Sequence, residues 1–339
     1  MGRHTSVPRH ALRAASLLTG ALVLVGCTTV PRALAAVGLP SLSLDAPLTT
    51  VACTTGGTCV ALGASGGANA PSTTAQIRNE KGLWSALRAP AALLATFDTG
   101  SCASTRCYFG GTKSSGELLW SINANNGAIN SLAGPPGGVV IRNVSCVNDN
   151  ECAVLDVAAH DALRLSYTTN AGTTWSAPRT LRWASVADTA LSCLAVTDCF
   201  VASSSARHVV TLRQTLNGGA RFISVPTPPT WQSLTSLQCA PQCTALVTTA
   251  SASAVATQVG TTWHQSPLSF HAAALSCATT SACLVVGQRS NATPDMVQWT
   301  PHGVRPVALT YVPSNLTDVA CRPSVCVAIG ITTVVAVQP

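Results

Sequence analysis

The chain has 339 residues, of which 47% are hydrophobic and 9% are charged, so it is long and apolar enough to bury a large core. No apolar run after residue 27 approaches the ~20 residues of a membrane-spanning helix, which argues against an integral membrane protein. The formal charge of +7 falls to +4 without residues 1–26, and the charges are scattered without a basic run, which argues against nucleic-acid binding.

Residues 1–26 have the features of a bacterial signal peptide. The segment begins with several basic residues, and its apolar second half is too short to span a membrane as a mature helix. It ends in the sequence Leu24-Val25-Gly26-Cys27, which resembles the lipobox of bacterial lipoproteins.

This resemblance implies cleavage between Gly26 and Cys27 and a diacylglyceryl thioether on Cys27. The mature protein is then expected at the cell membrane, lipid-anchored on the extracytoplasmic side, with residues 27–36 as a tether. The alternative is an ordinary secretory signal that is cut later, near Ala33-Leu34-Ala35.

The other fourteen cysteines fall into seven close pairs, whose first members are 38 to 49 residues apart. A period near 45 residues is the size of one four-stranded propeller blade, and seven such repeats fill the mature chain. The sequence therefore predicts an all-β, seven-bladed β-propeller over residues 37–339. The pairs are Cys53 with Cys59, Cys102 with Cys107, Cys146 with Cys152, Cys193 with Cys199, Cys239 with Cys243, Cys277 with Cys283, and Cys321 with Cys326.

Apolar residues flank each cysteine pair, as in Leu191-x-Cys193 before the first cysteine and Cys59-Val60-Ala61-Leu62 after the second. Short apolar runs on either side of a tight turn are typical of a β-hairpin. Opposed cysteines in antiparallel strands are close enough for a disulfide, so we expect one short disulfide in every blade.

Zinc is the alternative reason for closely paired cysteines. Structural zinc sites prefer two to four residues between their cysteines, and only the pair Cys239 and Cys243 has fewer than four intervening residues. An exported chain also enters an oxidising compartment, which favours disulfides over metal.

A second motif follows the hairpin in several repeats and combines polar residues, glycine and an aromatic residue. It is found in Thr168–Trp175, Thr215–Phe222, Gln258–Trp263 and Asn79–Trp84. These segments resemble the Asp-box (BNR repeat) of sialidase-like propellers, with Asn or Gln in place of Asp.

The resemblance implies that each segment folds the turn between the third and fourth strands of a blade. In that turn glycine takes a positive φ, the Asx side chain accepts from nearby amides, and the aromatic residue packs between blades. Repeats two, six and seven lack a full box.

The last repeat ends early, at Pro339, one strand short of a complete blade. The segment Val37–Leu44 is a spare strand at the other end of the sequence. We expect this segment to supply the missing fourth strand of the final blade, which would remove an exposed sheet edge.

No catalytic constellation emerges. Tyr108 and Glu151 adjoin hairpin cysteines, so the hairpins of the blades set their positions. We therefore do not expect them to form a sialidase-like catalytic site. Other glycosidases need two carboxylates that flank one bond. The aspartates Asp98, Asp156, Asp161, Asp188, Asp295 and Asp318 stand in no context that indicates such a pair.

No cofactor or metal site is predicted. The histidines of the repeats fall singly, without the spacing of metal ligands, and the chain has no G-x-S-x-G motif and no P-loop.

If the protein binds a ligand, we expect the binding surface on one face of the propeller. This face is formed by the connections between second and third strands and between successive blades. Polar and aromatic side chains gather there, although loops also collect polar residues for no functional reason. The candidate binding residues are His160, Asp161, Arg207, His208, Trp231, Arg289, Asp295 and Tyr311.

These observations favour a non-catalytic, membrane-anchored propeller that binds a protein or glycan partner, as an assembly scaffold does. The alternative is a carbohydrate-active hydrolase of sialidase-like fold, which requires two carboxylates within ~5–10 Å at the channel mouth.

Overall fold

The computed structural model describes residues 35–38, 47–65, 72–88, 95–113, 116–240, 242–310, 312, 314–331 and 333–337. Residues 33–339 form one compact unit. The predicted signal peptide, Cys27 and Tyr311 lie outside the described residues.

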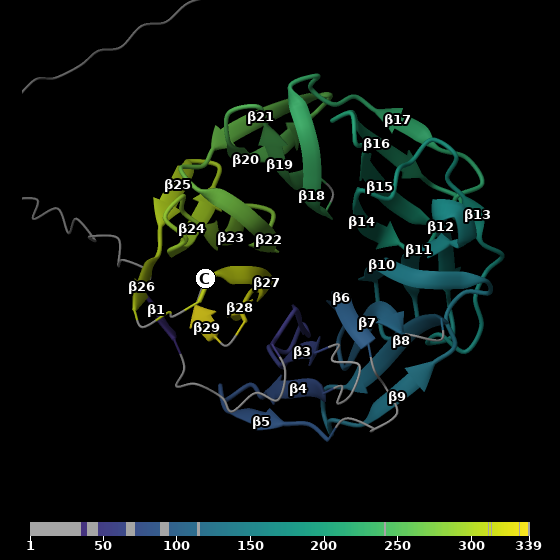
Figure 1. The fold of residues 1–339 in the computed structure, drawn as a ribbon, viewed down its shortest axis with the longest axis horizontal. Coiled ribbons are helices and arrows are strands. Elements are labelled where there is room, and N and C mark those ends of the chain that lie inside the picture. The colour runs from purple at the N-terminus through teal and green to yellow at the C-terminus, as the bar shows by residue number, and fades with distance from the viewer. Residues whose placement is uncertain are drawn as a thin grey trace, which may run out of the picture. The chain divides into compact units, whose positions relative to one another are not determined.

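The protein is a seven-bladed β-propeller of four-stranded antiparallel blades, as predicted (Figure 1). Blade 1 contains β2 (Thr50–Cys53), β3 (Cys59–Ser65), β4 (Ser72–Arg78) and β5 (Trp84–Ala86). Blade 2 contains β6 (Ala95–Cys102), β7 (Arg106–Lys113), β8 (Gly116–Asn123) and β9 (Ile129–Leu132). Blade 3 contains β10 (Gly138–Cys146), β11 (Cys152–Ala158), the 3-10 turn η1 (Ala159–Asp161), β12 (Ala162–Thr168) and β13 (Arg179–Thr180).

Blade 4 contains β14 (Asp188–Ala195), β15 (Asp198–Ser204), β16 (Val210–Thr215) and β17 (Ile223–Val225). Blade 5 contains β18 (Trp231–Cys239), β19 (Cys243–Thr249), β20 (Ser253–Val259) and β21 (Thr262–Pro267). Blade 6 contains β22 (His271–Thr279), β23 (Ala282–Gln288), β24 (Pro294–Thr300) and β25 (Gly303–Pro306). Blade 7 contains β27 (Leu316–Arg322), β28 (Val325–Gly330) and β29 (Val334–Val337), with β1 (Ala35–Gly38) and β26 (Ala308–Thr310) at its outer edge.

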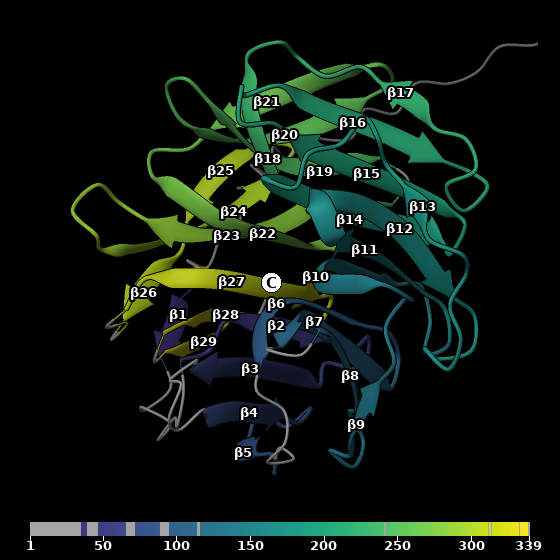
Figure 2. The same cartoon turned by 45° about the vertical axis from the view of Figure 1, so that its right-hand side comes forward.

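Each blade follows one plan, from an inner strand a beside the central axis to an outer strand d. The tilted view shows this progression from β14 to β17 in blade 4 (Figure 2). We call the side with the a–b hairpins and c–d turns the disulfide face, and the side with the b–c loops and d–a connections the loop face.

All fourteen cysteines of the repeats form the predicted disulfides, each between the end of strand a and the start of strand b. In chain order the bridges join Cys53 to Cys59, Cys102 to Cys107, Cys146 to Cys152, Cys193 to Cys199, Cys239 to Cys243, Cys277 to Cys283, and Cys321 to Cys326.

The paired half-cystines face each other directly in the strand register, as Cys146 and Cys152 do in blade 3. Their Cα atoms lie 3.8 to 4.0 Å apart, so each bridge fastens the hairpin at the foot of its blade. Zinc is thereby excluded as the reason for the pairs.

The b strands explain the apolar runs that follow each second cysteine. All six residues of β28 are buried, and Val60, Ala61 and Leu62 in β3 are fully buried. A b strand is covered on both faces by neighbouring blades, so both sets of side chains are apolar instead of alternating with polar ones.

Side-chain hydrogen bonds link the inner strands of successive blades. The residue before the first cysteine of a blade accepts the amide of the next blade's first cysteine, at distances of 2.8 to 3.0 Å. These acceptors are Ser101, Ser145, Ser192, Gln238 and Ser276. Amides at the free edge of the a strands are satisfied in this way.

The N-terminal strand closes the ring, as predicted. β1 pairs antiparallel with β29 and so becomes the fourth strand of blade 7. It begins at Ala35, two residues before the predicted start, and residues 39–44 lie outside the described residues. The parallel pairing of β26 with β1, which adds a fifth strand, was not expected from the sequence.

The c–d turns of blades 3 and 4 share one hydrogen-bond pattern. The Gly172 amide donates to Thr168 Oγ1 at 3.0 Å, and the Thr174 amide donates to Asn170 Oδ1 at 2.9 Å. In blade 4 the corresponding donors are Gly219 and Arg221, and the acceptors are Thr215 and Asn217. Gly172 and Gly219 have φ values of 81° and 87°, so each turn needs glycine at this position.

Aromatic residues after these turns pack between blades. Trp175 Nε1 donates to the Ala133 carbonyl of the preceding connection at 2.8 Å, and Trp263 Nε1 donates to the Pro226 carbonyl at 2.9 Å. These two indoles therefore help to hold neighbouring blades together.

Candidate binding face and central channel

The candidate binding residues lie mainly in the b–c loops of the loop face. His160 and Asp161 are exposed in blade 3, and Arg207 and His208 are exposed in blade 4. The structure thus places these four side chains on one face of two successive blades, where a single partner is able to reach both loops.

Several of these loop residues hold an unusual backbone conformation. His160, Asp161 and His208 have φ values of 61°, 55° and 58°, in the left-handed region that favours glycine. At His208 a tight turn fixes the conformation, because the Ser205 amide donates to the Val209 carbonyl and the His208 amide to the Ser205 carbonyl. Each non-glycine residue in this conformation destabilises the folded state by about 1 kcal/mol or more, so the surrounding structure must hold it in place. The turns therefore present these side chains in a defined direction.

Arg289 and Asp295 form a separate pair in blade 6. Arg289 Nε donates to Asp295 Oδ2 at 2.7 Å, and Asp295 is buried whereas the Arg289 side chain is 60% exposed. Their charges largely compensate each other, which leaves less net charge here for a ligand than at Arg207.

Trp231 is a core residue, only 1% exposed. Its ring packs edge-on against Trp263, with ring centroids 4.9 Å apart. The indole nitrogen is buried without a hydrogen-bond partner. Trp231 therefore belongs to the floor of the loop face and does not project from its surface.

A groove of about 610 Å³ lies above Trp231 on the loop face, between blades 4 and 5. His208 and the b–c loop 249–254 line it, together with Pro229 and Pro267. The groove therefore joins two of the predicted binding residues, His208 and Trp231, in one largely apolar hollow.

A smaller hollow of about 220 Å³ lies between blades 3 and 4, beside Arg182, Trp183 and Val209. Trp183 is fixed there by Phe222, at 5.4 Å between ring centroids, and by the Arg213 guanidinium, 4.6 Å from the ring centroid. The cation–π contact and the ring contact make Trp183 part of the scaffold.

The central channel is a further hollow, with a volume of about 510 Å³. The a strands of all seven blades line it. Its charged lining residues among the described part of the chain are Asp98 in blade 2 and Asp318 and Arg322 in blade 7.

Asp318 holds blades 7 and 1 together at their inner strands. Its carboxylate accepts the Val51 amide of blade 1 at 2.9 Å and the Val319 amide at 2.8 Å. Part of the residue is accessible from the channel, but protein surrounds the carboxylate. This burial raises the pKa of Asp318 to about 6, although the two amides and Thr50 act to lower it.

Asp98 differs from Asp318 because the residue is exposed at the channel wall. Partial desolvation raises the pKa of its carboxyl group, while Arg142 and a hydrogen bond from Thr96 act in the opposite direction. The two channel carboxylates are thus held in different surroundings, one in a blade junction and one facing solvent.

Arg322 spans the disulfide end of the channel. Its Nη2 donates to the Cys102 carbonyl of blade 2 at 2.7 Å, although it follows Cys321 in blade 7. Burial lowers the pKa of Arg322, but a guanidinium remains protonated. No sequence pattern indicates this residue, because its partner is 220 positions away.

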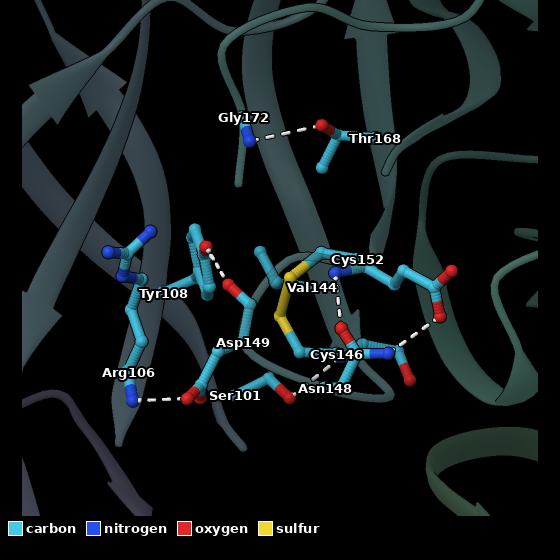
Figure 3. The surroundings of a disulfide bond; sticks show 12 residues. Ser101, Arg106, Tyr108, Val144, Cys146, Asn148, Asp149, Cys152, Thr168 and Gly172 are labelled. Atoms are coloured by element: carbon cyan, nitrogen blue, oxygen red, sulfur yellow. Dashed lines mark hydrogen bonds between the residues drawn. A yellow bond between two sulfur atoms is a disulfide. The ribbon is translucent and has the colours of Figure 1, made fainter. Parts of the chain in front are cut away.

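Asp149 is a carboxylate with many hydrogen bonds that no sequence pattern indicates. It lies in the a–b hairpin of blade 3 and binds the hairpin of blade 2 (Figure 3). Its oxygens accept from Ser104 Oγ, from Thr105 Oγ1 and from the Thr105 and Arg106 amides, at 2.6 to 3.2 Å. Partial desolvation would raise the pKa of Asp149, but these hydrogen bonds outweigh it and lower the pKa to about 2.

Tyr108 and Asp156 have structural roles within the blades. The fully buried Tyr108 donates its hydroxyl to the Asp149 carbonyl at 2.7 Å. Asp156 is buried beside Arg164, whose Nε donates to it at 3.1 Å. Burial raises the pKa of Asp156 and Arg164 acts to lower it. Neither residue faces the channel or the groove.

Within the described part of the chain, no group of three His, Cys, Asp or Glu side chains is arranged to hold a metal ion. No helix among the same residues is long and apolar enough to cross a membrane.

Comparison with known proteins gives structural neighbours only. No protein-family model matches the chain, and no curated protein sequence matches it. The similarity of its c–d turns to the Asp-box therefore remains a resemblance.

Solved structures with the same architecture are numerous. YCF48 bound to D1 peptide has a TM-score of 0.64 at 11% identity, with 90% of this chain and 94% of that chain covered. Virginiamycin B lyase from Staphylococcus aureus, bound to quinupristin, has a TM-score of 0.64 at 8% identity, with 89% and 98% covered. The GH74 xyloglucanase from Xanthomonas campestris has a TM-score of 0.63 at 12% identity, with 88% and 53% covered. At such identities the likeness shows the fold alone, a seven-bladed propeller that is shared by binding proteins and enzymes.

Proposed function

We propose that the protein is a non-catalytic binding scaffold, anchored to the extracytoplasmic side of the membrane by lipid on Cys27, that engages a protein partner through its loop face. The groove between blades 4 and 5 carries this proposal. Its largely apolar lining, which includes Trp231, Pro229 and Pro267, suits an apolar segment of a partner.

The rim of the groove adds the polar part of a binding site. His208 and the neighbouring Arg207 are exposed, and the described residues contain no ion pair that engages them. An apolar floor with a polar rim is the usual build of a protein-binding surface. The solved structure of YCF48 with a peptide shows that a propeller of this kind is able to hold a protein segment.

The test is cross-linking of the lipidated protein in its native membrane, followed by capture and identification of the partner. The Ser251→Arg variant places a charge in the groove, and Ser290→Arg makes the same change in the corresponding b–c loop of blade 6. We expect Ser251→Arg to lower capture at least ten-fold and Ser290→Arg to leave it unchanged. Equal capture by both variants would overturn the role of the groove.

Lipidation is tested separately by mass spectrometry of the mature protein. The expected N-terminal residue is a diacylglyceryl-modified Cys27, and the Cys27→Ser variant should be released from membranes. An unmodified N-terminus near Ala35 would contradict the anchor without affecting the groove.

The hydrolase alternative depends on the channel carboxylates, Asp98 and Asp318. Hydrolysis of chromogenic glycosides by the wild-type protein that is abolished in both Asp98→Asn and Asp318→Asn would replace the scaffold proposal with an enzyme. We expect no turnover above that of the double variant.

A further inference from the structure

We infer that the disulfide face of the propeller lies on the lipid surface and that the loop face with its groove points away from the membrane. This inference rests on the proposed lipid anchor at Cys27. It concerns a surface that the anchor alone does not specify, because an anchored domain is able to present any side to the membrane.

The chain enters the propeller at the disulfide face of blade 7. Val37 of β1 pairs with Ala336, which in turn pairs with Val327. Val327 directly follows Cys326, the half-cystine at the foot of blade 7. Because β1 runs from Ala35 towards the loop face, its first residue lies at the disulfide edge of the blade.

The tether between Cys27 and the propeller is short. Eight residues lead from Cys27 to Ala35, and eight residues span at most about 28 Å when fully extended. A tether that starts from the disulfide edge reaches a membrane below that face directly. If the loop face lay against the membrane instead, the same tether would have to run along the whole height of the blade to reach the lipid.

Exposed aliphatic side chains favour the same orientation independently of the tether. Nine large hydrophobic residues are exposed among the described residues, and six of them lie at the disulfide edge of their blades. They are Leu83 (66% exposed), Leu216 (57%), Ile223 (50%), Val259 (50%), Val147 (37%) and Leu194 (37%).

Most of this set is centred on blade 4, on the opposite side of the ring from β1 (Figure 1). Leu194, Leu216 and Ile223 belong to blade 4, with Val147 and Val259 in the adjacent blades. Two attachments on the same face, one covalent at blade 7 and one apolar at blade 4, would lay the whole ring flat on the lipid surface.

The polar groups of the patch are compatible with contact to lipid headgroups. Asp149, two residues after Val147, is already hydrogen-bonded by the hairpin of blade 2. The remaining charged neighbours are of both signs, such as Lys81 and Glu80, so apolar contact rather than a basic surface supplies the attraction.

The experiment measures amide hydrogen exchange of the lipidated protein on vesicles of phosphatidylethanolamine and phosphatidylglycerol. The reference is the Cys27→Ser protein mixed with the same vesicles. We expect at least five-fold slower exchange at residues 80–83, 147–150 and 216–223 of the anchored protein. Residues 205–209 and 249–252 on the loop face should exchange equally in both samples.

Matched substitutions separate contact with lipid from anchoring alone. Leu216→Asp should restore fast exchange at residues 216–223, and Val209→Asp, at a loop-face residue that is 59% exposed, should leave the protection intact. Thermal melting of both variants verifies that they fold.

Other outcomes overturn the inference in distinguishable ways. Protection of the loop face, or of neither face, contradicts the proposed orientation while the lipid anchor stands. Protection of the patch in native membranes but not on protein-free vesicles would assign it to a protein partner. An unmodified Cys27 would instead refute the anchor and with it the basis of the proposal.

Discussion

Asp318 lies at the junction between the last blade and the first, at the position where Thr99 and Ser236 supply hydroxyl acceptors in other junctions. Its carboxylate accepts the Val51 amide in place of a hydroxyl group. A charged acceptor forms a stronger hydrogen bond than a hydroxyl, but its burial makes the ionised form costly.

The raised pKa of Asp318 makes this junction sensitive to pH. The folded-state pKa of about 6 exceeds the unfolded value of about 3.9, so the folded protein takes up a proton first as the pH falls. We expect the melting temperature of the wild type, relative to that of Asp318→Asn, to rise between pH 7.5 and pH 5. Calorimetry at both pH values measures this difference, and a constant difference would refute the prediction.

Asp149 should behave in the opposite way. Its pKa of about 2 lies below the unfolded value, so its stabilisation is present above pH 4 and is lost as the pH falls towards 2. We expect Asp149→Asn to lower the free energy of unfolding at pH 7 by about 2 kcal/mol, because several charge-assisted hydrogen bonds are weakened. Urea denaturation measures this loss, and the exposed Asp161→Asn, with the same chemical change, is the control.

At the scale of the blade, one hairpin is repeated seven times with its disulfide at the foot. The half-cystines are only four to six positions apart, so each bridge closes a short loop. In the chain-entropy model such a loop restricts the unfolded state by about 2 kcal/mol.

Removal of one bridge should therefore cost a similar amount whichever blade is chosen. We expect the paired change Cys146→Ala and Cys152→Ala to lower the free energy of unfolding by about 2 kcal/mol, with a smaller loss from two small cavities. Denaturation of the variant against the wild type measures the effect. A loss above about 5 kcal/mol would show that the bridges are required for folding and not merely stabilising.

At the scale of the whole molecule, the ring is closed by a strand from the other end of the chain. Without β1, the backbone edge of β29 would face solvent and offer unpaired groups to another chain. The covalent link between the sheet of blade 7, which contains β1, and blade 1, which begins with β2, would also be lost.

Deletion of residues 28–38 tests this closure. We expect a lower melting temperature and concentration-dependent association, whereas deletion of residues 28–33, which leaves β1 intact, should cause neither. Light scattering and thermal melting across a range of concentrations measure both effects. A shortened protein that stays monomeric and equally stable would show that β1 is dispensable.

The sequence by itself determined the blade number, the disulfide pairing and the closing strand. These features depend on local spacing or on the count of repeats, since Cys146 and Cys152 meet within one hairpin and a final repeat that lacks a strand needs another segment to complete it. The apolar runs of the b strands likewise follow from a period of two combined with burial on both faces.

Only the tertiary structure decided which polar residues act together. Arg322 reaches Cys102 across the channel, Asp149 binds a hairpin 43 to 45 positions earlier, and His208 and Trp231 meet at one groove. The same structure placed Trp231 in the core and paired Arg289 with Asp295, which the spacing of these residues does not indicate. The physical reason is that blades contact each other through side chains from separate repeats, and the period of a repeat contains no information on how its neighbours fit together.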